Sequence, residues 1–154
     1  MIVTYRRMTL EDVPAVHEID ELSFSLPWPE RSFRFELTSN PVTRAWVAEA
    51  EGQVAAMLVL WLIMDEAHIA TIATHPDFRR QGIGERIMLE ALLSARAEGG
   101  RHAFLEVRAS NLGAQAMYKK YGFIVAGLRP HYYRDNDEDA ILMDLLDLEG
   151  LEIA

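Results

Sequence analysis

Hydrophobic residues recur at helical spacing over one long segment in the middle of the chain. Ile83, Ile87 and Ala91 lie one turn apart, and Ala95 continues the series. The pattern stops at Glu98-Gly99-Gly100, a combination typical of a helix end. The spacing therefore predicts a helix that begins at about Ile83.

Shorter hydrophobic patterns alternate between strand and helix along the rest of the chain. Apolar runs bounded by turn residues predict strands over Ile2–Arg6, Ala45–Ala50, Val54–Met64, Ala67–Thr74, Ala103–Val107, Phe123–Tyr132 and Asp139–Leu145. Helical spacing predicts helices from a capping-box start at Thr9 to about Leu22, over Glu30–Leu37, and from about Leu112 to Tyr121. This order of elements is typical of a mixed α/β domain.

Length and composition fit one globular domain. The chain has 154 residues, of which 50% are hydrophobic, enough to bury a substantial core. We expect a single domain over residues 1–147. A short acidic tail over residues 148–154 follows, either as a helical turn or as a loose end.

Cysteine content and charge exclude several classes of protein. The sequence has no cysteine, which excludes disulfides, thiolate nucleophiles and cysteine-based metal sites, and its histidines show no metal-ligand spacing. A net charge of −9 argues against broad nucleic-acid binding and could favour cationic partners. No apolar run is long enough to span a bilayer, and no secretion signal opens the chain. We expect a cytoplasmic protein with no metal and no membrane or nucleic-acid partner.

The loop before the long helix has a pattern typical of phosphate binding. It reads Arg79-Arg80-Gln81-Gly82-Ile83-Gly84 and precedes the helix directly. Free backbone N–H groups, the helix dipole and the small glycines favour a diphosphate at this helix N-terminus. A P-loop and a dinucleotide fingerprint both fail, because Glu85 and Ile87 stand where those motifs need lysine and glycine. An ordinary exposed loop remains the alternative.

Segments after this loop extend the pattern through most of the chain. They include residues 105–111 (LEVRASN), Ala116-Met117-Tyr118 and Tyr121-Gly122-Phe123. With the glycine loop they resemble the GNAT acyl-CoA-dependent N-acetyltransferases, in particular the RimI branch, which acetylates protein N-termini. The resemblance implies a single-domain GNAT fold with a central, mostly antiparallel, twisted mixed sheet of about six to seven strands and about four helices. One splayed strand pair would hold acetyl-CoA.

The resemblance also implies roles for individual residues. Glu106 matches the general base, and Tyr118 matches the general acid that protonates the departing thiolate. Trp28, Tyr132 and Tyr133 match positions that flank the substrate peptide. The positions implied for acetyl-CoA, the acetyl donor, are Ile72, Ala73, Thr74, Arg79, Arg80, Gln81, Gly82, Ile83, Gly84, Glu85 and Asn111.

Each of these residues also has a simpler structural interpretation. Strand alternation alone makes Glu106 an exposed carboxylate, and Asn111 stands where a helix N-cap belongs. Tyr118 and Trp28 could be core aromatics. Glu85 favours the dipole of the helix whose first turn it occupies, although its carboxylate would lie near the expected diphosphate.

Three functions remain open from the sequence. They are acetylation of a protein α-amine, nominally that of a ribosomal protein; acetylation of a lysine side chain or a small amine; and binding of acetyl-CoA without catalysis. An α-amine has a reference pKa of about 8, against about 10.4 for lysine, so a carboxylate base suffices for it. Without cysteine or a Gly-x-Ser-x-Gly elbow, we expect direct attack in a ternary complex. We favour the first function.

Overall fold

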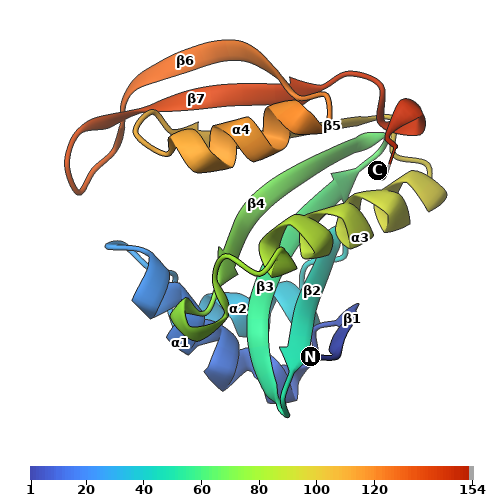
Figure 1. Cartoon of the computed structure of the whole chain (residues 1–154), viewed down its shortest axis with the longest axis vertical. Coiled ribbons are helices and arrows are strands. Elements are labelled where there is room, and N and C mark those ends of the chain that lie inside the picture. The colour runs from blue at the N-terminus through green and yellow to red at the C-terminus, as the bar shows by residue number, and fades with distance from the viewer. Residues whose placement is uncertain (153–154) are drawn as a thin grey trace.

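The computed structural model describes residues 1–152 and contains one seven-stranded sheet flanked by helices (Figure 1). The strands are β1 (Val3–Arg7), β2 (Thr43–Ala50), β3 (Gln53–Ile63), β4 (Glu66–Thr74), β5 (His102–Arg108), β6 (Ile124–Tyr133) and β7 (Glu138–Leu145). The helices are α1 (Val13–Ser23), α2 (Glu30–Thr38), α3 (Ile83–Ala97) and α4 (Leu112–Lys120). The strand order is β1-β2-β3-β4-β5-β7-β6, and only β4 and β5 are parallel. The predicted fold class is confirmed.

The first helix begins later than its sequence pattern predicts. A 3-10 turn over Leu10–Asp12 precedes α1, which starts at Val13. Pro14 explains the difference, because it has no N–H to donate to the Leu10 carbonyl. The expected capping contact is present, since the Thr9 N–H donates to an Asp12 carboxylate oxygen at 2.7 Å. The capping signal is therefore correct, but it begins a 3-10 turn.

The two halves of the sheet separate between β4 and β5. These strands pair only from Glu66 to His68 on β4, opposite His102 to Phe104 on β5. Beyond His68 they diverge into a V, with β1 to β4 on one arm and β5 to β7 on the other (Figure 1). The Arg101 and His102 N–H groups both donate to the Asp65 carbonyl, at 2.7 and 3.1 Å, and secure the foot of the V.

A bulge in β4 contributes to this separation. Val59 of β3 pairs with Thr71, but the next residue, Leu60, pairs with Ile69. Ala70 is thus an extra residue without a partner in β3. An extra residue bends its strand and increases the local twist, which turns β4 away from β5.

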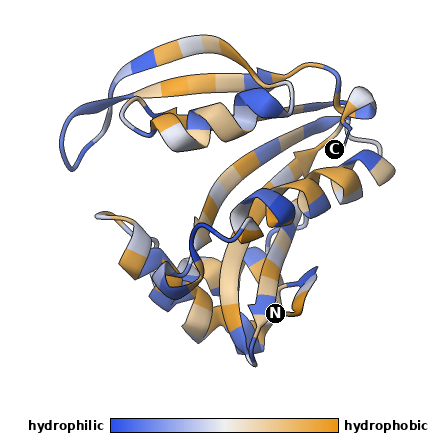
Figure 2. Cartoon of the chain, viewed as in Figure 1, coloured by the Kyte–Doolittle hydropathy of each residue, from blue (hydrophilic) through white to orange (hydrophobic). Residues whose placement is uncertain are grey.

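Helices cover both faces of the β1 to β4 arm. Alternate strand residues such as Val47 and Met57 pack against α1 and α2, whereas Ala48 and Leu58 belong to the core under α3. Hydrophobic residues accordingly run along the strands and the inner side of α3, while the segment leading into α3 and the β6–β7 turn are hydrophilic (Figure 2). No helix of residues 1–152 combines the length and apolar character that membrane crossing requires.

The segment after β7 packs against the domain as far as it is described. A 3-10 turn runs over Leu148–Gly150, and Leu148 is fully buried in the core that includes α3. Its N–H donates to the Arg101 carbonyl at 3.0 Å. Of the two forms expected for residues 148–154, a helical turn is the one observed, and residues 153 and 154 lie outside the described part.

The burial of Leu148 leads to a stability prediction. Leu148→Ala should lower the free energy of unfolding by about 2 to 5 kcal/mol, because it leaves a cavity beside α3. Leu146→Ala is the matched control, since Leu146 is 60% exposed and its truncation should change stability by less than about 0.5 kcal/mol. Urea denaturation of both variants measures this difference, and equal effects would contradict the packing of the turn.

Candidate active site

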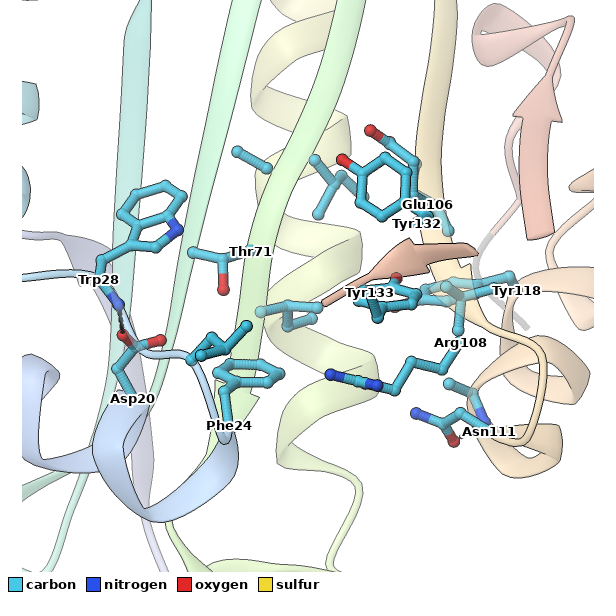
Figure 3. Close-up of a pocket in the computed structure, with 17 residues that line it drawn as sticks. Asp20, Phe24, Trp28, Thr71, Glu106, Arg108, Asn111, Tyr118, Tyr132 and Tyr133 are labelled. Atoms are coloured by element: carbon cyan, nitrogen blue, oxygen red, sulfur yellow. Dashed lines mark hydrogen bonds between the residues drawn. The ribbon is translucent and has the colours of Figure 1, made fainter. Parts of the chain in front are cut away.

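A cavity of about 360 Å³ opens between the two arms of the V. Its walls come from α1, the α1–α2 segment, β4, β5, α4 and the end of β6 (Figure 3). Residues far apart in the sequence meet here because β4 and β5 diverge. The cavity brings together Trp28, Ile72, Glu106, Asn111, Tyr118, Tyr132 and Tyr133 from the sequence-predicted site.

Glu106 lies on β5, two residues beyond the last residue that pairs with β4. Its neighbours Leu105 and Val107 are buried in the core, whereas Glu106, on the opposite face of the strand, is partly exposed, and all three residues border the cavity. The side chain is 19% exposed, and its carboxylate is held by the His68 Nε2 atom at 2.8 Å. It is a half-buried, hydrogen-bonded group, unlike the freely exposed carboxylate of the simpler interpretation.

His68 is a site residue that the sequence did not reveal. It is the last residue of β4 that pairs with β5, and its ring stacks on Phe104 with centroids 4.4 Å apart. Trp61, its partner on β3, meets the His68 ring edge to face with centroids 5.3 Å apart, and Trp61 Nε1 donates in turn to the buried Glu36 carboxylate at 2.9 Å. His68 therefore has a fixed position from which to orient Glu106.

Tyr118 approaches the cavity from α4 and is 5% exposed. Its ring packs near Phe123, with centroids 5.6 Å apart, so it also serves the core. Burial, with a smaller effect of nearby Tyr133, raises the pKa of the Tyr118 hydroxyl to about 12. The hydroxyl consequently keeps its proton near neutral pH and can donate it.

Asn111 caps a helix and also lies on the cavity wall. It is the N-cap of α4, where its Oδ1 atom accepts the Ala114 N–H at 3.2 Å. The same residue lines the cavity on its α4 side (Figure 3). Capping thus fixes the position from which Asn111 could contact a ligand.

The glycine loop borders a second hollow of about 320 Å³ outside the cavity. Gly82 is the α3 N-cap with φ +78°, a conformation that favours glycine. A Cβ atom on Gly84 would come within 3.0 Å of the Thr74 Oγ1 atom, so glycine lets α3 approach β4 closely. The free N–H groups of this helix end could bind an anion.

The charged side chains of this loop differ in their direction. Arg79 turns back, with Nε donating to the Thr74 carbonyl at 3.0 Å and a terminal nitrogen to Ser23 Oγ at 3.2 Å. Arg80, with φ +62°, also lines the hollow. Glu85 binds Lys120 Nζ at 2.9 Å, and this bond lowers the pKa of its carboxyl. The Glu85 carboxylate is thereby paired with a cation.

The remaining residues implied for acetyl-CoA binding do not all face the cavity or the second hollow. Ala73 is buried in the core beneath α1 and α2, so only its backbone can face a ligand. Ile83, the first residue of α3, is buried in the core while also bordering the second hollow. Gln81 is exposed and lines neither hollow.

Aromatic side chains stand on both sides of the cavity. Tyr132 and Tyr133 meet edge to face at 5.1 Å, and the Arg108 guanidinium covers the Tyr133 ring at 4.0 Å. Burial raises the pKa of Tyr133 to about 12. Trp28 faces them from the α1–α2 segment and stacks on Trp61 at 6.4 Å (Figure 3).

Arg108 anchors the β6–β7 hairpin over this region. It binds the Asp135 carboxylate at 2.9 Å and the Glu138 carboxylate at 3.2 Å. Hydrogen bonds from Ser110, including its backbone N–H at 2.6 Å, lower the pKa of Glu138 to about 2. The hairpin that carries both tyrosines is therefore fixed to β5.

Asp20 is a second acidic group on the cavity wall that the sequence did not reveal. It is 1% exposed and accepts the Trp28 backbone N–H at 2.6 Å. Burial raises the pKa of its carboxyl, partly opposed by this hydrogen bond. Neither the helical position of Asp20 nor its neighbours in sequence indicates this contact. Among residues 1–152, no three histidine or acidic side chains gather closely enough to hold a metal ion.

Comparisons with known proteins identify the family of this chain. Residues 13–123 match the acetyltransferase (GNAT) family, to which the chain belongs. It is 42% identical over 138 residues to a Bacillus subtilis (strain 168) protein provisionally named as a ribosomal protein bS18-alanine N-acetyltransferase, covering 90% of this chain and 91% of that protein. The Escherichia coli (strain K12) enzyme of that name is 33% identical over 153 residues, covering 92% and 96%.

Solved structures give the same family and fold. The crystal structure of the ribosomal-protein-S18-alanine N-acetyltransferase from Escherichia coli matches with a TM-score of 0.87 and 31% identity, covering 99% of this chain and 100% of that one. A chain from the NatC complex bound to Gag peptide and CoA matches with a TM-score of 0.84 at 18% identity, covering 95% and 99%, which supports the fold alone. The chain is therefore an acetyltransferase of the GNAT fold.

The contact between His68 and Glu106 leads to a prediction on activity. His68→Leu should lower the rate of acetyl transfer by about tenfold to a hundredfold, because Glu106 loses the group that holds it and small displacements in an active site cost rate steeply. His68→Gln, whose amide can still donate to Glu106, should retain more activity. Rates measured across pH, with thermal unfolding of both variants, separate orientation from packing. Equal losses in the two variants would assign His68 to packing only.

Proposed function

We propose that this chain transfers the acetyl group of acetyl-CoA to the α-amino group of a protein amino terminus. One observation carries the proposal. Glu106 and Tyr118 both line the same cavity, at the point where β4 and β5 diverge. A base and an acid on one cavity are what direct transfer between a thioester and an amine requires.

Acetyl-CoA is the donor that these residues fit. It supplies an acetyl group activated as a thioester. The N-terminus of α3, with Gly82, Gly84 and the paired Glu85, offers free N–H groups to a diphosphate. Ile72, Ala73 and Thr74 lead from this loop along β4 toward the cavity, a suitable path for the pantetheine arm. Asn111 stands across the V from that path.

Glu106 is the base in this proposal. It accepts a proton from the incoming ammonium group, directly or through a water molecule, while His68 holds the carboxylate in place. An α-ammonium has a reference pKa of about 8, against about 10.4 for lysine, so it loses its proton more readily near neutral pH. This difference favours an amino terminus over a lysine side chain.

In this proposal β4 stabilises the oxyanion and Tyr118 protonates the departing thiolate. Beyond His68, β4 has no partner on its β5 side, so the N–H groups facing β5 are free to bind the developing oxyanion. Tyr118, with its pKa raised to about 12, then donates a proton to the departing thiolate. No covalent acetyl-enzyme is needed.

The acceptor reaches Glu106 between the α1–α2 segment and the β6–β7 hairpin. Trp28 on one side and Tyr132 and Tyr133 on the other bind its first residues. The names of the Bacillus subtilis and Escherichia coli relatives point to the amino-terminal alanine of ribosomal protein bS18 as the acceptor. We adopt this as the nominal substrate.

A peptide assay tests this function. The protein should transfer acetyl groups from acetyl-CoA to a short peptide that begins with alanine. It should leave unmodified the same peptide with a blocked amino end and an internal lysine. Mass spectrometry of the products locates the acetyl group. Equal acetylation of the blocked peptide would refute the α-amine assignment.

Replacing the proposed base tests the mechanism. Glu106→Gln should lower turnover by about a hundredfold or more, the usual effect of removing a general base, while acetyl-CoA still binds. Glu66→Gln, at the exposed start of β4, is the matched control and should leave turnover unchanged. Steady-state kinetics across pH, with calorimetric acetyl-CoA binding, provide the measurement. Unchanged turnover in Glu106→Gln would remove Glu106 from this role.

A further inference from the structure

Asp20 has a carboxylate that is 1% exposed and has one hydrogen-bond donor among residues 1–152, although its second oxygen is not fully closed off from the cavity. Its Oδ2 atom accepts the Trp28 N–H at 2.6 Å, which is the one hydrogen bond found for this side chain within residues 1–152. The second oxygen is turned away from Trp28, toward the side on which Phe24 lies (Figure 3). Because an ionised carboxylate has about four acceptor positions, one N–H leaves most of that capacity unused.

No cation within residues 1–152 forms an ion pair with Asp20. The charged groups that influence its pKa are His17 and Glu21 on the same helix, and the His17 Nδ1 atom lies 3.5 Å from a carboxylate oxygen of Glu21. Burying a carboxylate without a counter-ion is unfavourable unless another donor arrives. A ligand that brings such a donor would therefore gain more binding free energy at Asp20 than at an exposed carboxylate.

The charges around the cavity favour a cationic ligand. Asp20 and Glu106 are the acids that line it, on opposite walls (Figure 3). Arg108 is the basic residue in the lining, and it is already bound by Asp135 and Glu138 and stacked on Tyr133. The positive charge of Arg108 is therefore already balanced by these two carboxylates. The negative charge of Asp20 has no such partner among the described residues of the cavity lining.

We propose that the free oxygen of Asp20 binds a cationic side chain near the amino end of the acceptor, a preference that rests on the proposed function. With the α-amine at Glu106, the peptide runs across the cavity toward α1 and the α1–α2 segment. A lysine or arginine side chain in its first residues then reaches Asp20 past Phe24 and Thr71 (Figure 3). Asp20 thus selects among amino termini without taking part in proton transfer.

Asp20 also fixes the α1–α2 segment through Trp28, and the two roles can be separated. Asp20→Asn keeps an oxygen for the Trp28 N–H and replaces the free oxygen with an NH₂ group, which repels a cation. Glu21→Gln removes the same charge from the next, exposed position of α1 and serves as the control. Thermal unfolding checks that both variants remain folded.

The experiment compares peptides that differ only in one ammonium group. Peptides beginning with alanine carry lysine, or its uncharged analogue norleucine, at residue two or at residue three. Acetylation kinetics and calorimetric binding to the CoA-loaded protein are measured for the wild type, Asp20→Asn and Glu21→Gln. For at least one position, we expect the wild type and Glu21→Gln to favour lysine by about tenfold or more in KM and in dissociation constant. Asp20→Asn should lose this preference while handling the norleucine peptides like the wild type.

Other results would overturn the proposal in distinguishable ways. A wild type that acetylates α-amines without a lysine preference refutes the role of Asp20 and leaves the proposed function intact. A uniform loss on every peptide in Asp20→Asn would show that Asp20 only supports the loop or binds the α-ammonium. A wild type that neither binds nor acetylates any of the peptides refutes both proposals.

Discussion

The early separation of β4 and β5 is the constraint on which the site depends. Three residue pairs join these strands, after which they diverge with their backbone groups unpaired. A regular sheet would satisfy those groups internally and close the space between the arms. The bulge at Ala70 bends β4 away and maintains the gap. Glu106 and Tyr118, the two groups proposed for proton transfer, both border the space that results.

Helices and strands position one part of the site, and individual side-chain bonds position the other. Glu106 and His68 lie on paired or core-facing strand positions, and Tyr118 is on a helix packed into the core. The side proposed for the acceptor consists of the α1–α2 segment and the end of the β6–β7 hairpin, and individual bonds fix both, such as Trp28 to Asp20 and Arg108 to Glu138. Secondary structure thus fixes the positions of Glu106, His68 and Tyr118. Side-chain contacts fix the segments on the other side of the cavity.

Much of this fold could be predicted from local sequence patterns, and the parts that could not depend on distant contacts. The spacing from Ile83 onward gave α3 directly, whereas the 3-10 turn before α1 depended on the missing N–H of Pro14. The sequence motif predicted Glu106 as a candidate site residue but did not predict its partner His68. The sequence of one strand does not determine its register with a parallel neighbour. The contact of Asp20 was not predicted for a similar reason, because its partner Trp28 lies in the segment after α1.

The foot of the V holds the two arms together as one body. The Arg101 N–H donates to the Asp65 carbonyl there, and the three residue pairs between β4 and β5 lie beside this bond. One hydrophobic core also spans both arms, since it includes Leu58 on one arm and Leu105 on the other. Opening the V further would therefore separate close-packed core residues, which is unfavourable. The width of the cavity is thus a property of the folded core and does not depend on loop positions alone.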